Sequence, residues 1–171
     1  QPTSADIAAQ RQILGIADRP SLLLYSRLFE FETTRLAQIL AGVKAALPEV
    51  AIVSIGTSLF ADDAAQLQDE LIKTAVLPAL IDLGWIEPEQ LPMLLSSADV
   101  ALYLMDDTLL NRTKCPVKLA DLIALGSVVV AEAVGQVSEY VISGHTGQLC
   151  PSGDVSGLTN NTVSLLENTS R

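Results

Sequence analysis

Apolar and polar positions along the chain follow two alternating periods. Six short runs are apolar at most positions, as expected for strands buried on both faces of a sheet: 21–26, 50–56, 80–86, 99–105, 127–132 and 147–150. The stretches between and after these runs favour helices, mostly by helical spacing of their apolar residues: 32–47, 62–79, 87–98, 116–125, 136–143 and 154–168. Strands that alternate with helices are typical of crossover units in a parallel sheet.

The pattern therefore predicts an α/β fold in which helices cover both faces of a six-stranded parallel sheet. We expect residues 21–154 to form one domain and residues 155–171 to supply its C-terminal helix. In such sheets ligands bind at the carboxyl ends of the strands, near the point where the strand order reverses. The turns that follow the strands are therefore the segments in which to look for a site.

Composition excludes several classes of partner. The chain has 171 residues and a formal net charge of −10, which argues against duplex nucleic acid and against anionic membrane surfaces. No apolar run reaches the roughly 20 residues of a membrane span, and the first residues do not resemble a signal peptide. Cys115 and Cys150 have neither metal-ligand spacing nor a disulfide framework. We therefore expect a cytoplasmic protein with reduced thiols.

Three cations form a cluster in a region that is otherwise acidic or apolar. Arg112, Lys114 and Lys118 fall within seven positions, between the strand predicted over 99–105 and the first turn of the following helix. Pro116 suits the first position of that helix. Lys118 then lies at the positive pole of the helix, where a cation is unfavourable by roughly 0.3–1 kcal/mol.

An anion-binding site would explain the cluster. Helix N-termini bind phosphate through free N–H groups, and lysines add charge. Arg27, which follows the first predicted strand, would converge on the same crevice. The alternative is that the cations only neutralise Asp106, Asp107 and Asp121 as surface ion pairs. Spacing alone leaves both interpretations open.

Familiar catalytic motifs are absent from the sequence. It contains neither the phosphate-binding loop of nucleotide triphosphatases nor the glycine fingerprint of nicotinamide dehydrogenases. The only histidine, His145, has no recognisable triad partners, and no cluster has metal-ligand spacing. We therefore expect neither a cofactor nor a metal.

Three segments together resemble group 1 glycosyltransferases with GT-B architecture. The most specific is PVKLADLIALGSVVVAEAVGQVSEYVISGHTGQLCPSGD, residues 116–154, which resembles the signature region of that family. LLLYSRLFEF at 22–31 and GWIEPEQLPMLLSSADVALYLM at 84–105 resemble upstream family motifs. The order and spacing of the three segments carry the resemblance.

The resemblance implies a two-domain enzyme that moves a sugar from a nucleotide-sugar donor to an acceptor. This chain would be its C-terminal, Rossmann-like donor domain, one half of a GT-B fold. Residues 1–20 would be the connection from an N-terminal domain that holds the acceptor. By family analogy, transfer would be retaining and metal-free, and the isolated domain would bind the donor with little turnover.

The resemblance also implies roles for the charged residues. Arg27 and Lys118 would clamp the diphosphate and stabilise the leaving group, and Asp121 would accept hydrogen bonds from the ribose hydroxyls. Lys118 would then sit at the positive pole because a diphosphate lies between it and the helix terminus. Asp121, three positions further on, would neutralise Lys118 in the empty site.

Further binding positions follow from the same motifs. The backbone at Gly135 and Gln136, with Glu139 behind it, would approach the sugar and phosphates. Trp85 and Ile86 would pack on the nucleobase, although without the resemblance Trp85 would be expected at a partly buried core position.

Two departures from the family pattern keep other functions open. Glu32 replaces a second basic residue, and Thr113 replaces a glutamate. Lys114 or Arg112 would have to supply the missing cation, while Gly56 would line the donor site or merely supply a turn. The alternatives are a non-catalytic glycosyltransferase-like binding module and a domain resembling nucleotide-sugar epimerases.

Overall fold

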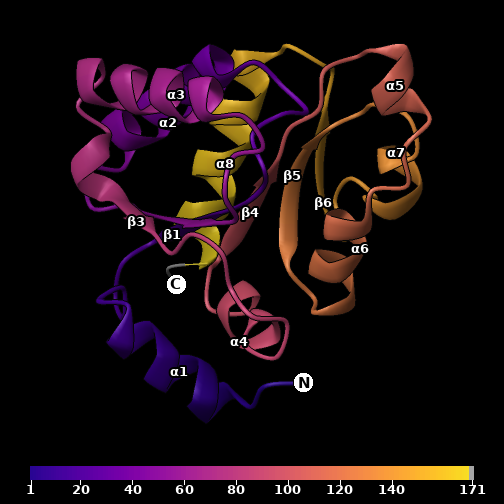
Figure 1. Ribbon diagram of the computed structural model, residues 1–171. Coiled ribbons are helices and arrows are strands. Elements are labelled where there is room, and N and C mark those ends of the chain that lie inside the picture. The colour runs from indigo at the N-terminus through magenta and orange to yellow at the C-terminus, as the bar shows by residue number, and fades with distance from the viewer. Residues whose placement is uncertain (170–171) are drawn as a thin grey trace.

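The computed structural model describes residues 1–169 and confirms the predicted α/β fold (Figure 1). All six predicted strands form, as β1 Ser21–Tyr25, β2 Ala51–Ile55, β3 Leu80–Asp82, β4 Val100–Tyr103, β5 Val128–Glu132 and β6 Gly147–Cys150. They make one sheet in the order β3-β2-β1-β4-β5-β6, and every neighbouring pair is parallel. The strand order therefore reverses between β1 and β4.

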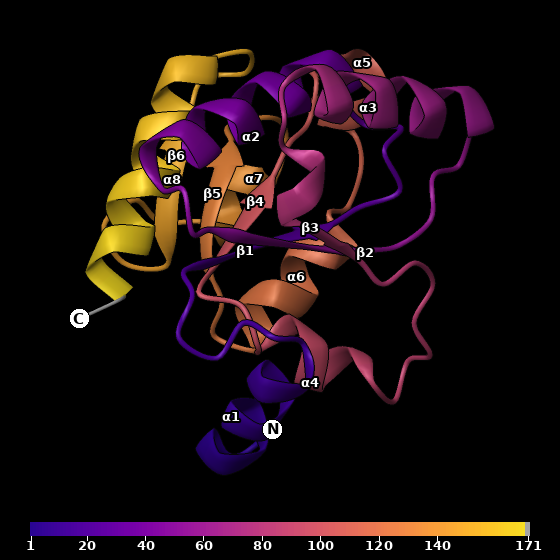
Figure 2. The same ribbon diagram turned by 90° about the vertical axis from the view of Figure 1, so that its left-hand side faces the viewer.

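Helices cover both faces of the sheet and complete a three-layer sandwich (Figures 1 and 2). They are α1 Ser4–Ile13, α2 Thr33–Ala46, α3 Ala61–Lys73, α4 Leu91–Leu95, α5 Leu109–Arg112, α6 Val117–Ala124, α7 Val137–Tyr140 and α8 Val155–Thr169, with a 3₁₀ turn at Leu77–Ala79. Leu22 and Leu24 of β1 pack with α2, α3 and α8, while Leu23 packs with α4, α6 and α7. The inner strands β1, β2, β4 and β5 are mostly apolar because both of their faces are buried.

Several predicted bounds are wrong. The helix predicted over 62–79 ends at Lys73, because Ala75 adopts a left-handed φ of 56° and a 3₁₀ turn follows. The strand expected over 80–86 is only three residues long, and the helix expected over 87–98 is only five. The final helix was expected to reach 171, but residues 170 and 171 lie outside the described part of the chain. Within residues 1–169, no helix has the length and hydropathy of a membrane span.

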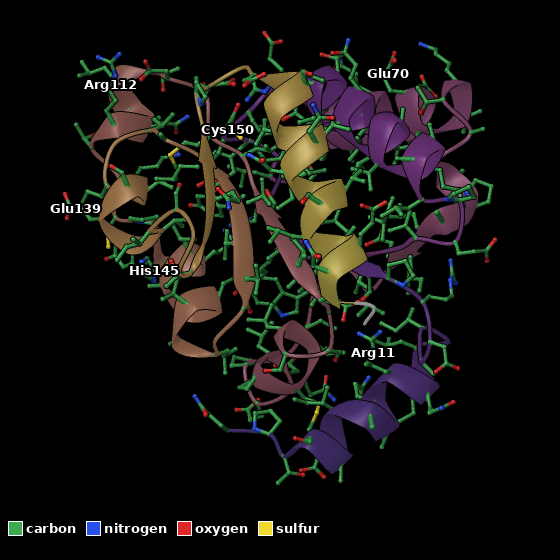
Figure 3. All side chains as sticks on the ribbon, turned by 180° about the vertical axis from the view of Figure 1, so that it is seen from behind. Arg11, Glu70, Arg112, Glu139, His145 and Cys150 are labelled. Carbon is green, nitrogen blue, oxygen red and sulfur yellow. The ribbon has the colours of Figure 1, made fainter. Side chains whose placement is uncertain are left out.

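The amino edge of the sheet is held by Arg11 of α1, a helix that the sequence did not reveal. Its guanidinium donates to the carbonyl oxygens of Ser97 at 2.8 Å and Arg19 at 2.9 Å. It also pairs with Asp99 at 3.1 Å. Figure 2 shows α1 and α4 together at one end of the molecule, and Figure 3 labels Arg11 there. The segment predicted as a connection is therefore attached to the domain.

The carboxyl edge is organised around Glu132, the last residue of β5. Its fully buried carboxylate accepts hydrogen bonds from the backbone N–H of Met105 at 2.7 Å and of Gly153 at 2.7 Å. A third comes from Arg35 at 3.0 Å, and Arg35 also pairs with Asp106 at 2.6 Å. Glu132 thus joins the end of β4, the start of α2 and the turn after β6.

We expect Glu132→Gln to lower the free energy of unfolding by about 3 kcal/mol, because breaking a buried ion pair leaves Arg35 undercompensated. The side-chain NH₂ group of the variant would also face one of the two backbone N–H groups, so that two donors would oppose each other. Glu70→Gln is the matched control, since among residues 1–169 Glu70 pairs only with the exposed Lys73 within α3. That change should cost less than about 0.5 kcal/mol in urea unfolding. Equal costs for the two variants would contradict this role for Glu132.

Candidate functional site

Lys118, Asp121 and Tyr25 lie together where the strand order reverses. Tyr25 ends β1, and the Lys118 Nζ atom is 5.8 Å from the centre of its ring. Burial raises the pKa of Tyr25, and the negative charge of Asp121 raises it further. The position of Lys118 in the first turn of α6 is confirmed, although Pro116 is the N-cap rather than the first helical residue.

The predicted ion pair between Lys118 and Asp121 is wrong. Lys118 appears in none of the ion pairs found in residues 1–169. Its ammonium lies over the ring of Tyr25 instead, an arrangement that attracts a cation without neutralising it. Among the described residues, moreover, no side chain caps the first turn of α6. The positive pole of this helix therefore keeps its charge.

Pairing with an aspartate explains Arg112 but neither of the lysines. The guanidinium of Arg112 makes a two-point contact with Asp107, with Nη2 and Oδ2 2.7 Å apart, and both side chains are exposed. Hydrogen bonding to Arg112 holds the pKa of Asp107 below its usual range. Asp106 pairs with Arg35, from α2, rather than with the cluster.

Lys114 and Arg27 are half-buried cations of the site, and each has a buried nitrogen atom. The ammonium of Lys114 is 4.3 Å from the ring centre of Phe29 and 3.7 Å from a carboxylate oxygen of Glu30. In the part of the chain described here, neither Lys114 Nζ nor Arg27 Nε has a hydrogen-bond partner, although both atoms are buried. These unsatisfied donors belong to the loops after β4 and β1, which flank the reversal of strand order.

Gly56 lets the loops after the first three strands approach closely. Its φ is 111°, and a Cβ atom there would lie 2.2 Å from the carbonyl oxygen of Ser26. Its N–H donates to the carbonyl of Gly84 at 2.8 Å, and the loop beyond it donates from Leu59 to the carbonyl of Arg27 at 3.0 Å. The structure thus explains why a glycine is needed at this turn, and the contact of Gly56 with a nucleotide-sugar stays a prediction.

The loop after β5 packs against the cationic loop. Gly135 has a φ of 54°, and a Cβ atom there would meet the backbone of Arg112 at 2.8 Å. Gln136 is the N-cap of α7, and Glu139 lies in its first turn. Figure 3 shows Arg112 and Glu139 on the same side of the molecule. The structure brings these predicted residues next to the cations, while their roles toward a sugar stay predictions.

The expected base-binding residues follow β3, the edge strand. Trp85 is 65% exposed, which rules out the partly buried core position. Ile86 is half-buried against the core on the α6 side of the sheet. Gly84 shapes this loop, because its φ is 61° and its N–H donates a hydrogen bond to the carboxylate of Asp82 at 3.1 Å. An exposed indole beside a half-buried isoleucine is available for a ligand.

The residues that hold the loops were missed by sequence reasoning. Asn111 is buried and donates to the carbonyl oxygens of Glu30 and Asp106, each at 2.9 Å. Tyr25 and Glu132 could have been found, because each is a polar residue at the end of an apolar strand. Across residues 1–169, His, Cys, Asp and Glu side chains nowhere gather in a group suited to a metal ion.

Several solved structures share this fold. The Anabaena protein HepE, in complex with UDP-glucose, superposes with a TM-score of 0.82 at 22% identity, over 98% of this chain and 44% of HepE. The pneumococcal O-GlcNAc transferase GtfA, in complex with UDP and GlcNAc, gives 0.70 at 19% identity over 87% and 29%. Sucrose-phosphate synthase from Thermosynechococcus elongatus gives 0.67 at 23% identity over 97% and 43%.

The chain thus spans less than half the length of each of these proteins. No curated protein sequence matches it. The family model for group 1 glycosyl transferases matches residues 19–168, which is most of the chain. The chain therefore belongs to the group 1 glycosyltransferase family, as its sequence motifs indicated.

Proposed function

We propose that the chain is the donor-binding domain of a cytoplasmic glycosyltransferase and that it binds a UDP-hexose. The observation that carries this proposal is a pair of buried cationic nitrogens without a hydrogen-bond partner, Arg27 Nε and Lys114 Nζ. They lie beside helix α6, which carries Lys118 in its first turn and has no side-chain cap among the described residues. Buried donors without acceptors are costly, and an anion with several oxygens would satisfy them together. A diphosphate has that chemistry, and a helix N-terminus adds favourable N–H groups.

Each cation has a role in the proposed reaction. Arg27 and Lys118 contact the diphosphate, and they stabilise the charge that develops on UDP as the bond between the sugar and the phosphate oxygen breaks. Lys114 replaces the basic residue missing at Glu32, because its packing on Phe29 places it against the same loop. The charge is balanced by side chains, so the proposal needs no metal.

The remaining predicted residues complete the donor site. Asp121 accepts hydrogen bonds from the ribose, and Trp85 and Ile86 pack on the base. The loop of Gly135 and Gln136, with Glu139 in the following turn, approaches the sugar, while Gly56 closes the loops around it. UDP is proposed as the nucleotide because HepE and GtfA were solved with it.

The acceptor is proposed to bind to an N-terminal domain of the same protein. The chain covers 44% of HepE, which leaves room for such a domain. Transfer to the acceptor hydroxyl is proposed to retain the anomeric configuration, by family analogy alone. The chain by itself should then bind the donor and show little transfer.

Calorimetric titration of the chain with UDP tests the cation roles. We expect saturable binding that weakens about tenfold in Lys118→Ala, Arg27→Ala and Lys114→Ala, because each variant loses a charge-assisted hydrogen bond. Arg112→Ala is the matched control, since its charge is already compensated by Asp107. That variant should bind UDP within about twofold of the unchanged chain.

The opposite results would identify another function. If the folded chain bound none of UDP, GDP and ADP, the proposal would fail. The departures at Glu32 and Thr113 would then favour a non-catalytic binding module. Thr113 is exposed, and its hydroxyl donates to the carbonyl of Leu110 at 2.9 Å. Loss of UDP binding in Arg112→Ala alone would instead move the anion site to the exposed end of α5.

The role of Asp121 can be tested with the ligand itself. The unchanged chain should bind UDP about tenfold more tightly than 2′-deoxy-UDP, because a hydroxyl–carboxylate hydrogen bond contributes roughly 1.5 kcal/mol. Asp121→Ala should bind the two ligands equally. Glu139→Gln serves as the acidic control and should preserve the discrimination. An undiminished preference for UDP in Asp121→Ala would exclude Asp121 as the ribose acceptor.

A further inference from the structure

We infer that Asn111 is a positioning residue that couples the loop of Arg27 to the loop of Lys114 and Lys118. Its predicted effect on ligand binding rests on the proposed function. The coupling of the two loops does not, because it follows from hydrogen bonds within the chain.

One side-chain amide bridges two segments that are distant in sequence. The Asn111 side chain donates from Nδ2 to the carbonyl oxygen of Glu30 and to that of Asp106, each at 2.9 Å. The first acceptor belongs to the loop after β1 and the second to the loop after β4. The backbone N–H of Asp106 donates to the same Glu30 carbonyl at 2.8 Å. A single NH₂ group therefore uses both hydrogens to hold the loops together.

The short helix that carries Asn111 is arranged to bury this residue. In α5, Leu109 is 79% exposed and Leu110 is 66% exposed, whereas Asn111 is only 5% exposed. An ordinary surface helix would bury the leucines and expose the amide. Thr108 caps the helix by accepting the backbone N–H of Asn111 at 3.2 Å. The inverted pattern indicates that α5 is built to place one polar side chain between two loops.

The same bridge determines where the cations lie. Glu30 and Phe29, which both contact the ammonium of Lys114, sit next to the carbonyl that Asn111 holds. On the other side, the carbonyl of Asn111 accepts the backbone N–H of Lys114 at 3.3 Å. Asn111 thus fixes both partners of the contact. If this bridge were lost, the bond from the Asp106 N–H to the Glu30 carbonyl would remain, but the distance between Arg27 and Lys114 would be less tightly set.

Two substitutions remove the bridge in different ways. Asn111→Leu is similar in size and has no donor, so both loop contacts are lost. Asn111→Asp keeps the shape and directs a carboxylate at two carbonyl oxygens, which drives the loops apart. Ser97→Ala is the control, because Ser97 is equally buried and donates to the carbonyl of Met93 at 2.8 Å, before the amino end of β4. This variant removes a buried hydrogen bond at the amino end of β4, away from the loops that Asn111 joins.

Amide hydrogen exchange and UDP titration of the chain test the inference together. In both Asn111 variants, exchange at residues 27–31 should accelerate about tenfold, and UDP affinity should fall about tenfold, as expected for the loss of buried hydrogen bonds. Ser97→Ala should lower the melting temperature and leave both quantities within about twofold. If an Asn111 variant does not fold, Thr108→Val provides a milder test, because it removes only the cap of α5.

A double-mutant cycle separates positioning from simple stabilisation. In an Arg27→Ala background, Asn111→Leu should weaken UDP binding by clearly less than the tenfold expected in the unchanged chain, because one of the two cations that it positions is already absent. Fully additive losses would overturn the inference, as would unchanged exchange at residues 27–31. If the unchanged chain bound no UDP while exchange accelerated as expected, the coupling would stand and the proposed function would fail.

Discussion

The buried carboxylate of Glu132 is the constraint on which the carboxyl edge of the sheet depends. A charge without exposure to water is tolerated only when donors surround it. Here those donors come from Met105 after β4, Arg35 in α2 and Gly153 after β6. Each of these three segments must therefore place its donor within hydrogen-bond distance of Glu132. The loops that carry the candidate site start from these positions, so their geometry follows from the compensation of one buried charge.

Most of the carboxylates at this edge of the sheet are paired with arginines rather than with lysines. Asp106 and Glu132 are occupied by Arg35, and Asp107 is occupied by Arg112. Two arginines thus consume three carboxylates near the cationic cluster. The lysines are left with much weaker compensation, although the whole chain carries a net charge of −10. A positive site in an acidic protein arises here from the pairing of charges, and no excess of basic residues is needed.

The sequence revealed those features that depend on local pattern or burial. Strands buried on both faces are mostly apolar, and the alternation of elements then determines the parallel sheet. The left-handed turn at Ala75 has no local signal, since alanine rarely adopts that conformation. Helix α5 was invisible because its leucines face solvent and its asparagine faces inward. The Asn111–Glu30 contact joins residues 81 positions apart, so only the folded chain brings the two together.

Two aromatic rings explain how lysines are held near the positive pole of α6. Carboxylate partners would neutralise the lysines and compete with any incoming anion. The ring of Tyr25 lies under Lys118, and each ring attracts its ammonium weakly without neutralising it. The ring of Phe29 lies under Lys114, whose ammonium is also 3.7 Å from a carboxylate oxygen of Glu30, too far for a hydrogen bond. Tyr25 is uncharged at neutral pH, since the ordinary pKa of tyrosine is about 10 and both burial and the nearby Asp121 raise the pKa of Tyr25 further. Lys118 is therefore held in place without an ion pair among the described residues, and Lys114 with only the longer contact to Glu30, which is the state that the proposed diphosphate site requires.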